Sequence, residues 1–425
     1  MKQQNSSKGE SHSPEREDID TPQGYKNSPL GIIPDDWEVK KLGEIGTFSK
    51  GYGVPKEAII DNGLSCLTYG DLYTKYDYVI KNIKSFIDNQ VAIESKEIAY
   101  GDILFAGSGE TPEDIGKCAA YIEKSKAYAG GDIIILRPNN HVDSITISYI
   151  LNSDIGGRQR YRCAQGHSIV HIYPYNLENI EIPLPPLPVQ RKIASILTLW
   201  DSAIEKQLQL IEKLELRKKG LMQQLLTGKK RLKGFEGEWK EVKLGEIAKV
   251  FSGGTPNTSQ KEYYVGDIPF IKSGEIFSNR TEQFVSKFGI DNSSAKLVNV
   301  GDILYALYGA TSGQCAISQI RGAINQAVLC IRTDENSYFI SSILKMNKDL
   351  YYNSFLQGGQ GNLSADIVKK YIFRLPTLTE QTAIATILTA ADQEIETEKN
   401  KLKQLRQQKK GLMQVLLTGK KRVKI

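Results

Sequence analysis

Two segments of the chain are near-copies of each other. Residues 184–233 and 375–424 align without a gap at an offset of 191 residues, and 27 of the 50 aligned residues are identical. The block KKGLMQ-x-LLTGKKR varies at a single position between the two copies. A repeat of this quality indicates duplication, so any fold for this chain must contain one architecture twice.

Weaker matches extend the repeat into the regions outside these segments. Trp37 in DDWEVKKLGEI parallels Trp239 in GEWKEVKLGEI, and the GDIL turn at Gly101 returns at Gly301. A chain of 425 residues is also long enough for two or three domains. We therefore expect five segments in this order: a disordered polar tail over 1–23, a globular domain over 24–183, a helical spacer over 184–233, a second globular domain over 234–374 and a second helical spacer over 375–425.

Each repeated segment predicts one long helix. Pro188 and Thr379 favour a helix start. Gly228 and Gly419 are typical of a helix end, where glycine adopts the left-handed backbone conformation. Between these ends, apolar residues recur at alternating spacings of four and three, which is the pattern of a coiled-coil seam. The seam residues are Ile193, Leu197, Trp200, Ile204, Ile211, Leu214, Leu221, Leu225, Ile384, Leu388, Ala391, Ile395, Leu402, Leu405, Leu412 and Leu416.

Polar residues interrupt both seams at equivalent places, Gln207 and Lys218 in the first helix and Glu398 and Lys409 in the second. Two seams of equal length with matched interruptions favour pairing with each other, and an antiparallel pair is topologically easiest when a whole domain lies between them. The alternative is that each helix buries its apolar stripe in its own globular region.

The globular regions combine short β-rich runs with polar turns, which predicts mixed α/β structure. The expected fold class is therefore mixed α/β, with two homologous globular domains joined by two long helices that form an antiparallel coiled coil.

Composition excludes several classes of protein. No stretch approaches the roughly 20 apolar residues of a membrane span, and the polar start of the chain is unlike a signal peptide. The five cysteines are scattered and form no C-x-x-C pair, which suits a reducing cytoplasm. The net charge of +6 resides on the helices, because residues 189–233 carry +7 and residues 380–424 carry +5.

The sequence lacks the common motifs of catalysis and cofactor binding. It contains no P-loop, no H-E-x-x-H and no Asn/Asp-Pro-Pro-aromatic turn of the kind that adenine methyltransferases use. Cys163, His167 and His171 have spacings that could suggest zinc, but a convincing fourth ligand is missing. We therefore expect no metal site, no cofactor and no catalytic residues in this chain, and a binding role becomes the default.

The motifs together resemble the specificity subunit of type I restriction-modification systems. The resemblance rests on L-P-x-L-x-x-Q-x-x-I-A-x-I-L and LLTGKKR in both copies, on GDILFAGSGETPEDIGKCA at Gly101 and on GDILYALYGATSGQ at Gly301, followed by AINQA at Ala323. It extends from about Gly24 to the end of the sequence, nearly the whole chain.

This resemblance implies two target-recognition domains, each reading one half of a split sequence in double-stranded DNA. It further implies paired helices that set the spacing and dock two methyltransferase subunits. Two ATP-dependent restriction and translocase subunits would complete the complex. The chain itself would be non-catalytic, and S-adenosylmethionine, ATP and magnesium would bind to partner subunits that methylate adenine N6 and cut DNA.

Candidate DNA-contacting residues lie in polar loops whose side chains suit DNA. Arginine can hold phosphates or guanine edges, and glutamine or asparagine can pair with adenine. In the first domain the candidates are Ser108, Glu110, Thr111, Arg158, Arg160, Arg162, Gln165, His167 and Ser168. In the second domain they are Lys272, Tyr308, Thr311, Ser312, Asn325, Gln326, Gln357, Gln360 and Asn362. The alternative for each residue is that it only shapes a turn.

Two other functions remain open. A self-sufficient nuclease or methyltransferase would act as the purified chain alone. A coiled-coil adaptor unrelated to DNA would show no sequence preference and little dependence of DNA affinity on salt, whereas phosphate contacts make affinity fall steeply with salt.

Overall fold

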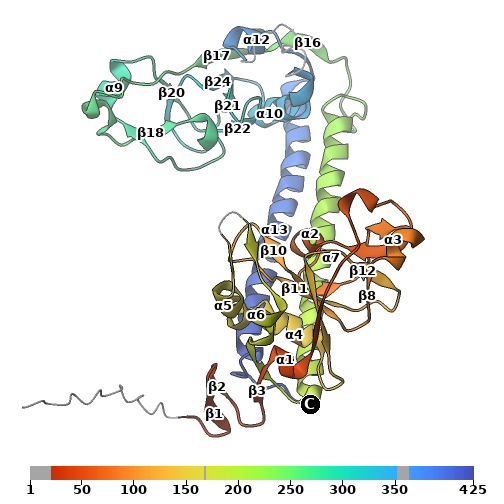
Figure 1. Cartoon of the computed structure of the whole chain (residues 1–425). Coiled ribbons are helices and arrows are strands. Elements are labelled where there is room, and N and C mark those ends of the chain that lie inside the picture. The colour runs from red at the N-terminus through yellow and green to blue at the C-terminus, as the bar shows by residue number, and fades with distance from the viewer. Residues whose placement is uncertain (1–20, 167–168, 352–362) are drawn as a thin grey trace, which may run out of the picture. The chain divides into compact units, whose positions relative to one another are not determined.

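The computed structural model describes residues 21–166, 169–351 and 363–425. Most of the expected polar tail, residues 1–20, lies outside the described residues. The chain divides into two compact units (Figure 1). Unit 1 comprises residues 1–206 and 403–425, and unit 2 comprises residues 207–402.

Unit 1 contains two larger sheets within the described residues, both covered by short helices. The first sheet has the order β4 (Gly46–Lys50), β13 (Ile133–Pro138), β9 (Ile103–Ala106), β11 (Cys118–Tyr121) and β6 (Val79–Ile80). The second has the order β7 (Phe86–Ile87), β5 (Leu64–Leu67), β12 (Ala127–Ala129) and β8 (Lys96–Ile98). Strands β5 and β12 run parallel, with Leu67 opposite Ala129.

Short strand pairs and helices complete unit 1. The pairs are β1 (Tyr25–Ser28) with β2 (Gly31–Pro34), β3 (Glu38–Lys41) with β15 (Glu181–Leu184), and β10 (Ser108–Gly109) with β14 (Val170–His171). The short helices are α1 (Leu42–Ile45), η1 (Lys56–Ala58), α2 (Tyr69–Thr74), α3 (Asn89–Ile93), α4 (Ser144–Leu151), α5 (Asp154–Arg162) and α6 (Pro174–Glu178).

Unit 2 repeats this plan. One sheet has the order β17 (Ala248–Ser252), β24 (Val328–Thr333), β21 (Ile303–Ala306) and β22 (Cys315–Ile317). The other has the order β19 (Phe284–Val285), β18 (Ile268–Ile271), β23 (Gly322–Ile324) and β20 (Lys296–Val298), and β16 (Lys240–Lys243) pairs with β25 (Ile372–Leu375). The short helices are α8 (Leu244–Ile247), η2 (Lys261–Tyr264), η3 (Ser273–Glu275), α9 (Lys287–Asp291), α10 (Ser337–Met346) and α12 (Ala365–Lys369).

Two 39-residue helices, α7 (Leu187–Leu225) and α13 (Leu378–Leu416), run through the repeated segments (Figure 1). The prediction that these helices end at glycines in the left-handed conformation is confirmed, because Gly228 and Gly419 adopt φ of +70° and +72°. Each glycine also packs against a tryptophan, Gly228 against Trp239 and Gly419 against Trp37, so the matching tryptophans are explained by contact with the helix ends.

The helices pair in antiparallel orientation. In unit 1, Ile193 and Leu197 of α7 share a core with Met413 and Leu416 of α13. In unit 2, Leu225 of α7 shares a core with residues near the start of α13, Ile384 and Leu388. All sixteen seam residues are buried or half-buried. The predicted fold class, mixed α/β with an antiparallel pair of long helices, is confirmed.

Candidate functional site

In unit 1 the fold brings together two candidate segments that are distant in sequence. Strand β10 carries the GSGET loop and pairs with β14, which follows the segment containing Gln165. The backbones of Gln165 and His171 also form two hydrogen bonds, of 2.8 and 3.0 Å. Glu110, Thr111 and Gln165 are exposed there, so their side chains are available to a ligand.

Ser108 is a correction to the sequence-based candidates. It is 4% exposed, and its Oγ lies 2.9 Å from Nδ1 of His171. Its backbone carbonyl accepts a hydrogen bond from the hydroxyl of Tyr73 at 3.0 Å. Ser108 therefore holds the two segments together inside the protein, and it does not face a ligand.

Arg160 is a second correction. The arginines at positions 158, 160 and 162 lie on one helix, α5, where residues two apart point to different faces. Arg158 and Arg162 are exposed, whereas Arg160 is 5% exposed and donates to the carbonyls of Leu151 and Ile115 at 3.2 and 2.7 Å. Arg160 thus joins α5 to the end of α4 and to Ile115, whereas the side chains of Arg158 and Arg162 are exposed.

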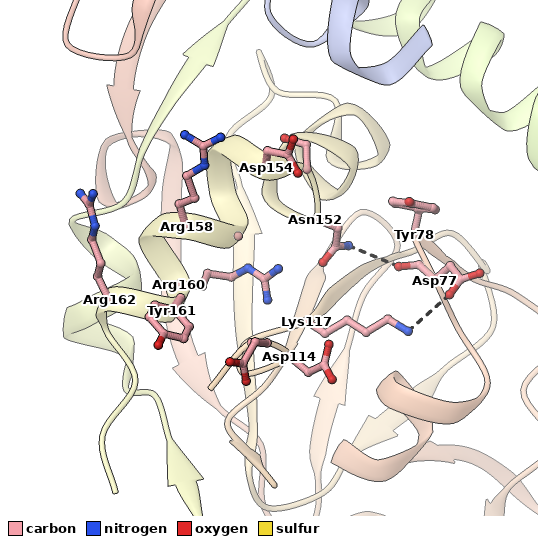
Figure 2. Close-up of a pocket in the computed structure, with 13 residues that line it drawn as sticks. Asp77, Tyr78, Asp114, Lys117, Asn152, Asp154, Arg158, Arg160, Tyr161 and Arg162 are labelled. Carbon is pink, nitrogen blue, oxygen red and sulfur yellow. Dashed lines mark hydrogen bonds and ion pairs between the residues drawn. The ribbon is translucent and has the colours of Figure 1, made fainter. Parts of the chain in front are cut away.

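A pocket of about 560 Å³ lies beside α5 (Figure 2). Figure 2 shows Arg160 pointing from α5 into this pocket, toward Asn152 and Lys117. Lys117 is already paired with Asp77 at 3.3 Å, and Asp114 and Asp154 also line the wall. Because carboxylates and cations balance in the wall, the pocket favours neither a cation nor an anion, and the two exposed arginines of α5 remain the stronger feature.

In unit 2 the candidates gather at the carboxyl ends of two parallel strands. Lys272 directly follows β18 and Asn325 directly follows β23, and these strands pair in parallel. Thr311 joins them, because its hydroxyl donates to the carbonyl of Ser273 at 3.2 Å. Gln326 is exposed beside Asn325. The structure therefore assembles one polar surface from loops that are 15 to 54 residues apart, at positions 272, 311 and 326.

Other candidates in unit 2 have a local role or lie outside the description. The hydroxyl of Ser312 donates to the carbonyl of Leu307 at 3.0 Å, which shapes the turn after β21. Tyr308 is half-buried and packs against the unit 2 core. His167, Ser168, Gln357, Gln360 and Asn362 lie outside the described residues.

The polar interruptions of the seam also have partners. In unit 1, Lys409 donates to Asp201, which also accepts the hydroxyl of Tyr149 from α4. In unit 2, Lys218 donates to Asp392, which also accepts the hydroxyl of Tyr338 from α10. We call these two arrangements the helix ties. Each one connects both long helices to a short helix of its globular region.

The remaining two interruptions, Gln207 and Glu398, bind each other. The side-chain amide of Gln207 donates to the backbone carbonyl of Glu398 at 3.1 Å and to its carboxylate. The interruptions thus specify the register of the helix pair, which is a known use of polar residues at coiled-coil positions. Sequence reasoning found these positions and missed their partners, since partners follow only from the register.

The described residues contain no group of three or more His, Cys, Asp or Glu side chains arranged to hold a metal ion. Cys163 and His171 are within this part of the chain, and His167 of the considered zinc set is not. No helix in the described ranges is both long enough and apolar enough to cross a membrane.

A family model, the type I restriction modification DNA specificity domain, matches the chain twice, at residues 34–216 and 236–407. The chain belongs to the type I restriction-modification specificity subunit family. Both matches run from a globular region into the long helix that follows it, so this specificity subunit contains the family domain twice, as its internal repeat requires.

Relatives of the specificity subunit match it over almost its whole length. The putative type I restriction enzyme MjaX specificity subunit of Methanocaldococcus jannaschii is 28% identical and covers 95% of this chain and 97% of its own. The MjaVIII specificity subunit of the same organism is also 28% identical, over 92% of this chain and 94% of its own. The crystal structure of the S subunit from M. genitalium has the same fold, with a TM-score of 0.58, 17% identity, and coverage of 90% of this chain and 96% of that one.

Proposed function

We propose that this chain is the non-catalytic DNA-recognition subunit of a type I restriction-modification complex. Its domains over 24–183 and 234–374 each read one half of a bipartite target in double-stranded DNA. The observation that carries the proposal is the repeated unit, in which exposed polar loops gather at the ends of equivalent strands. In unit 2 these loops present Lys272, Asn325 and Gln326, whose side chains suit phosphates and adenine edges.

The spacers over 184–233 and 375–425 set the distance between the two half-sites. The support is the continuity of α7 and α13, each of which would be about 58 Å long at 1.5 Å per residue. The helix ties add a rigid connection, because each aspartate bonds one residue of the other long helix and one tyrosine of a globular region. Half-sites that are read from one face of DNA lie about one helical turn apart, roughly 34–36 Å.

The long helices also dock two methyltransferase subunits. The support is that α7 leaves leucines outside the seam exposed, and a docked subunit would cover part of this apolar surface. These exposed leucines are Leu199, Leu208, Leu210 and Leu216. Two ATP-dependent restriction and translocase subunits complete the complex, and S-adenosylmethionine, ATP and magnesium bind to these partners in the cytoplasm.

The test is to map N6-methylated adenines across the genome of a host that carries the partner subunits, with and without this gene. We expect one split motif that disappears with the gene, with a constant gap between its halves. The purified chain alone should neither methylate nor cut DNA, and methylation should return when the methyltransferase subunit is added. Activity of the chain alone would favour an enzyme, and unchanged methylation would favour an adaptor unrelated to DNA.

A further inference from the structure

The two units share a set of backbone hydrogen bonds that aligns their loops residue by residue. In unit 2 these bonds run from the amides of Gly253, Gly254 and Asn325 to the carbonyls of Val328, Ile324 and Ile271. In unit 1 the corresponding bonds run from the amides of Gly51, Tyr52 and Gly130 to the carbonyls of Ile133, Ala129 and Leu67. Equivalent bonds define equivalent positions, even where the loops differ in sequence.

A fourth bond supports the same alignment. The amide of Lys272 binds the carboxylate of Glu275 at 3.0 Å, and the amide of Thr68 binds the carboxylate of Asp71 at 2.8 Å. Lys272 and Thr68 are therefore equivalent residues, each directly after the parallel strand of its unit.

The alignment shows an exchange of side chains between the two surfaces. Where unit 2 has Asn325 and Gln326, unit 1 has Gly130 and Gly131. Gly131 is exposed, and a side chain at this position would meet nothing within 4 Å. Unit 1 therefore presents bare backbone at Gly131, where unit 2 presents the exposed amide side chain of Gln326.

The exchange also runs in the opposite direction. Where unit 2 has the small residues Gly254 and Ser273, unit 1 has Tyr52 and Tyr69. These tyrosines are 55% and 40% exposed. Tyrosine offers both a flat apolar ring and a hydroxyl, and both suit contacts with sugars, thymine methyl groups and phosphates.

The same surface is continuous with the candidate GSGET loop. Helix α2 begins at Tyr69, and one turn later the hydroxyl of Tyr73 binds the carbonyl of Ser108 at 3.0 Å. In unit 2 the matching connection is the bond from Thr311 to the carbonyl of Ser273. The helix that begins at Tyr69 is thus bonded, through Tyr73, to the loop that carries the exposed Glu110 and Thr111.

We propose that Tyr52 and Tyr69 contact the DNA half-site of unit 1 above the open backbone of Gly131. They supply side chains at a surface where unit 2 instead uses Lys272, Asn325 and Gln326. This inference rests on the proposed function and adds to it the residues that give unit 1 its own sequence preference. At this surface, unit 1 then depends more on shape and apolar contact, and unit 2 more on charge and amide hydrogen bonds.

The experiment selects bound sequences from randomised duplex DNA, with the full chain assembled with its methyltransferase subunits. The double variant Tyr52→Ala/Tyr69→Ala should lose sequence preference in one half of the motif and bind about tenfold more weakly, while the other half stays unchanged. The variant Asn325→Ala/Gln326→Ala should relax the other half. Lys272→Ala should lower the slope of log affinity against log salt by about 1, and the tyrosine variants should leave this slope unchanged.

Tyr100→Ala is the matched control, because Tyr100 is a tyrosine of unit 1 that is 63% exposed and precedes β9 at the opposite end from the GSGET loop. It should leave both halves of the motif intact. The conservative variant Tyr69→Phe keeps the ring and therefore controls for misfolding of the alanine variants. It should retain most of the sequence preference. The inference is overturned if the double variant folds and selects the wild-type motif, or if it weakens both halves equally. If the wild-type complex selects no motif, the proposed function itself fails.

Discussion

The two helix ties use the same three residue types, but they differ in how deeply they are buried. In unit 1, Lys409 is 5% exposed, and its ammonium lies 3.8 Å from the ring centre of Tyr78 and 5.0 Å from that of Tyr149. In unit 2, the equivalent Lys218 is half-buried and borders a pocket of about 470 Å³ together with Asp392. One tie is therefore sealed by aromatic rings, whereas the other is open to water.

This difference indicates that the two helix ties contribute unequally to the free energy of unfolding. A buried cation depends on its carboxylate, because without it the desolvation of the charge is uncompensated. A cation that can reach water loses much less when its partner is removed. The duplicated sequence thus conserves the register of the helices in both units, while the strength of the connection differs between them.

The largest expected effect comes from removing the carboxylate of the sealed tie. Asp201→Asn removes the carboxylate that is bonded to the buried Lys409 and should lower the free energy of unfolding of unit 1 by about 3 kcal/mol. Asp392→Asn, the matched variant in unit 2, should cost about 1 kcal/mol, since Lys218 can turn to solvent. Urea unfolding would measure the loss of stability in both variants, and hydrogen exchange would locate it in the chain. Equal losses would show that burial does not distinguish the ties.

The second comparison concerns the arginines that follow the two long helices. Arg231 and Arg422 are equivalent in the repeat, yet Arg231 forms two bonds of 2.7 and 2.8 Å to Glu380, whose side chain is 2% exposed. Arg422 pairs with Asp36, and both of these side chains are exposed. Arg231→Met should therefore destabilise unit 2 by roughly 2–4 kcal/mol, because it leaves a buried carboxylate unpaired.

Arg422→Met is the control for this prediction and should cost less than about 1 kcal/mol. Thermal unfolding of both variants would provide the measurement. If Glu380→Gln in the Arg231→Met background restores stability, the cost arises from the unpaired charge. If it does not, the contact of Arg231 with the ring of Trp239 carries the effect instead.

These comparisons also indicate how much the sequence could predict. The seam, the antiparallel pair and the glycine helix ends follow from periodicity and turn chemistry, which are local properties. The partners of Lys218 and Lys409 do not, because they require the register between helices that are about 190 residues apart. Polar interruptions were visible at the right places, but a pattern does not state which residue lies opposite.

The candidate site was predicted less completely, for a similar reason. Arg160 was selected for its charge, although a helix turns alternate residues away from each other and buries this one. Tyr52 and Tyr69 were missed because tyrosine is common in ordinary strands. A signal was present in the LGEI motif, since alignment of Leu42 with Leu244 places Tyr52 opposite Gly254. This alignment does not by itself point to a binding surface, because only the fold brings Tyr52 and the ends of the parallel strands together.

The smallest expected effect is a dependence of stability on pH that belongs to the sealed tie. Burial lowers the pKa of Lys409 from its ordinary value, although bonding to Asp201 opposes the shift. The unfolded chain then keeps this proton to higher pH than the folded chain, so unfolding takes up a proton between the two pKa values. The free energy of unfolding contributed by Lys409 should therefore rise as the pH approaches about 10.4, the usual pKa of lysine.

Lys409→Met tests this directly, because methionine can cover the same tyrosine rings without a charge. The difference in stability between wild type and this variant, followed from neutral pH toward pH of about 10, should shift in favour of the wild type as the pH rises. A difference that stays constant with pH would mean that the pKa of Lys409 is the same in the folded and the unfolded chain. The contrast between the two helix ties would then come from packing alone.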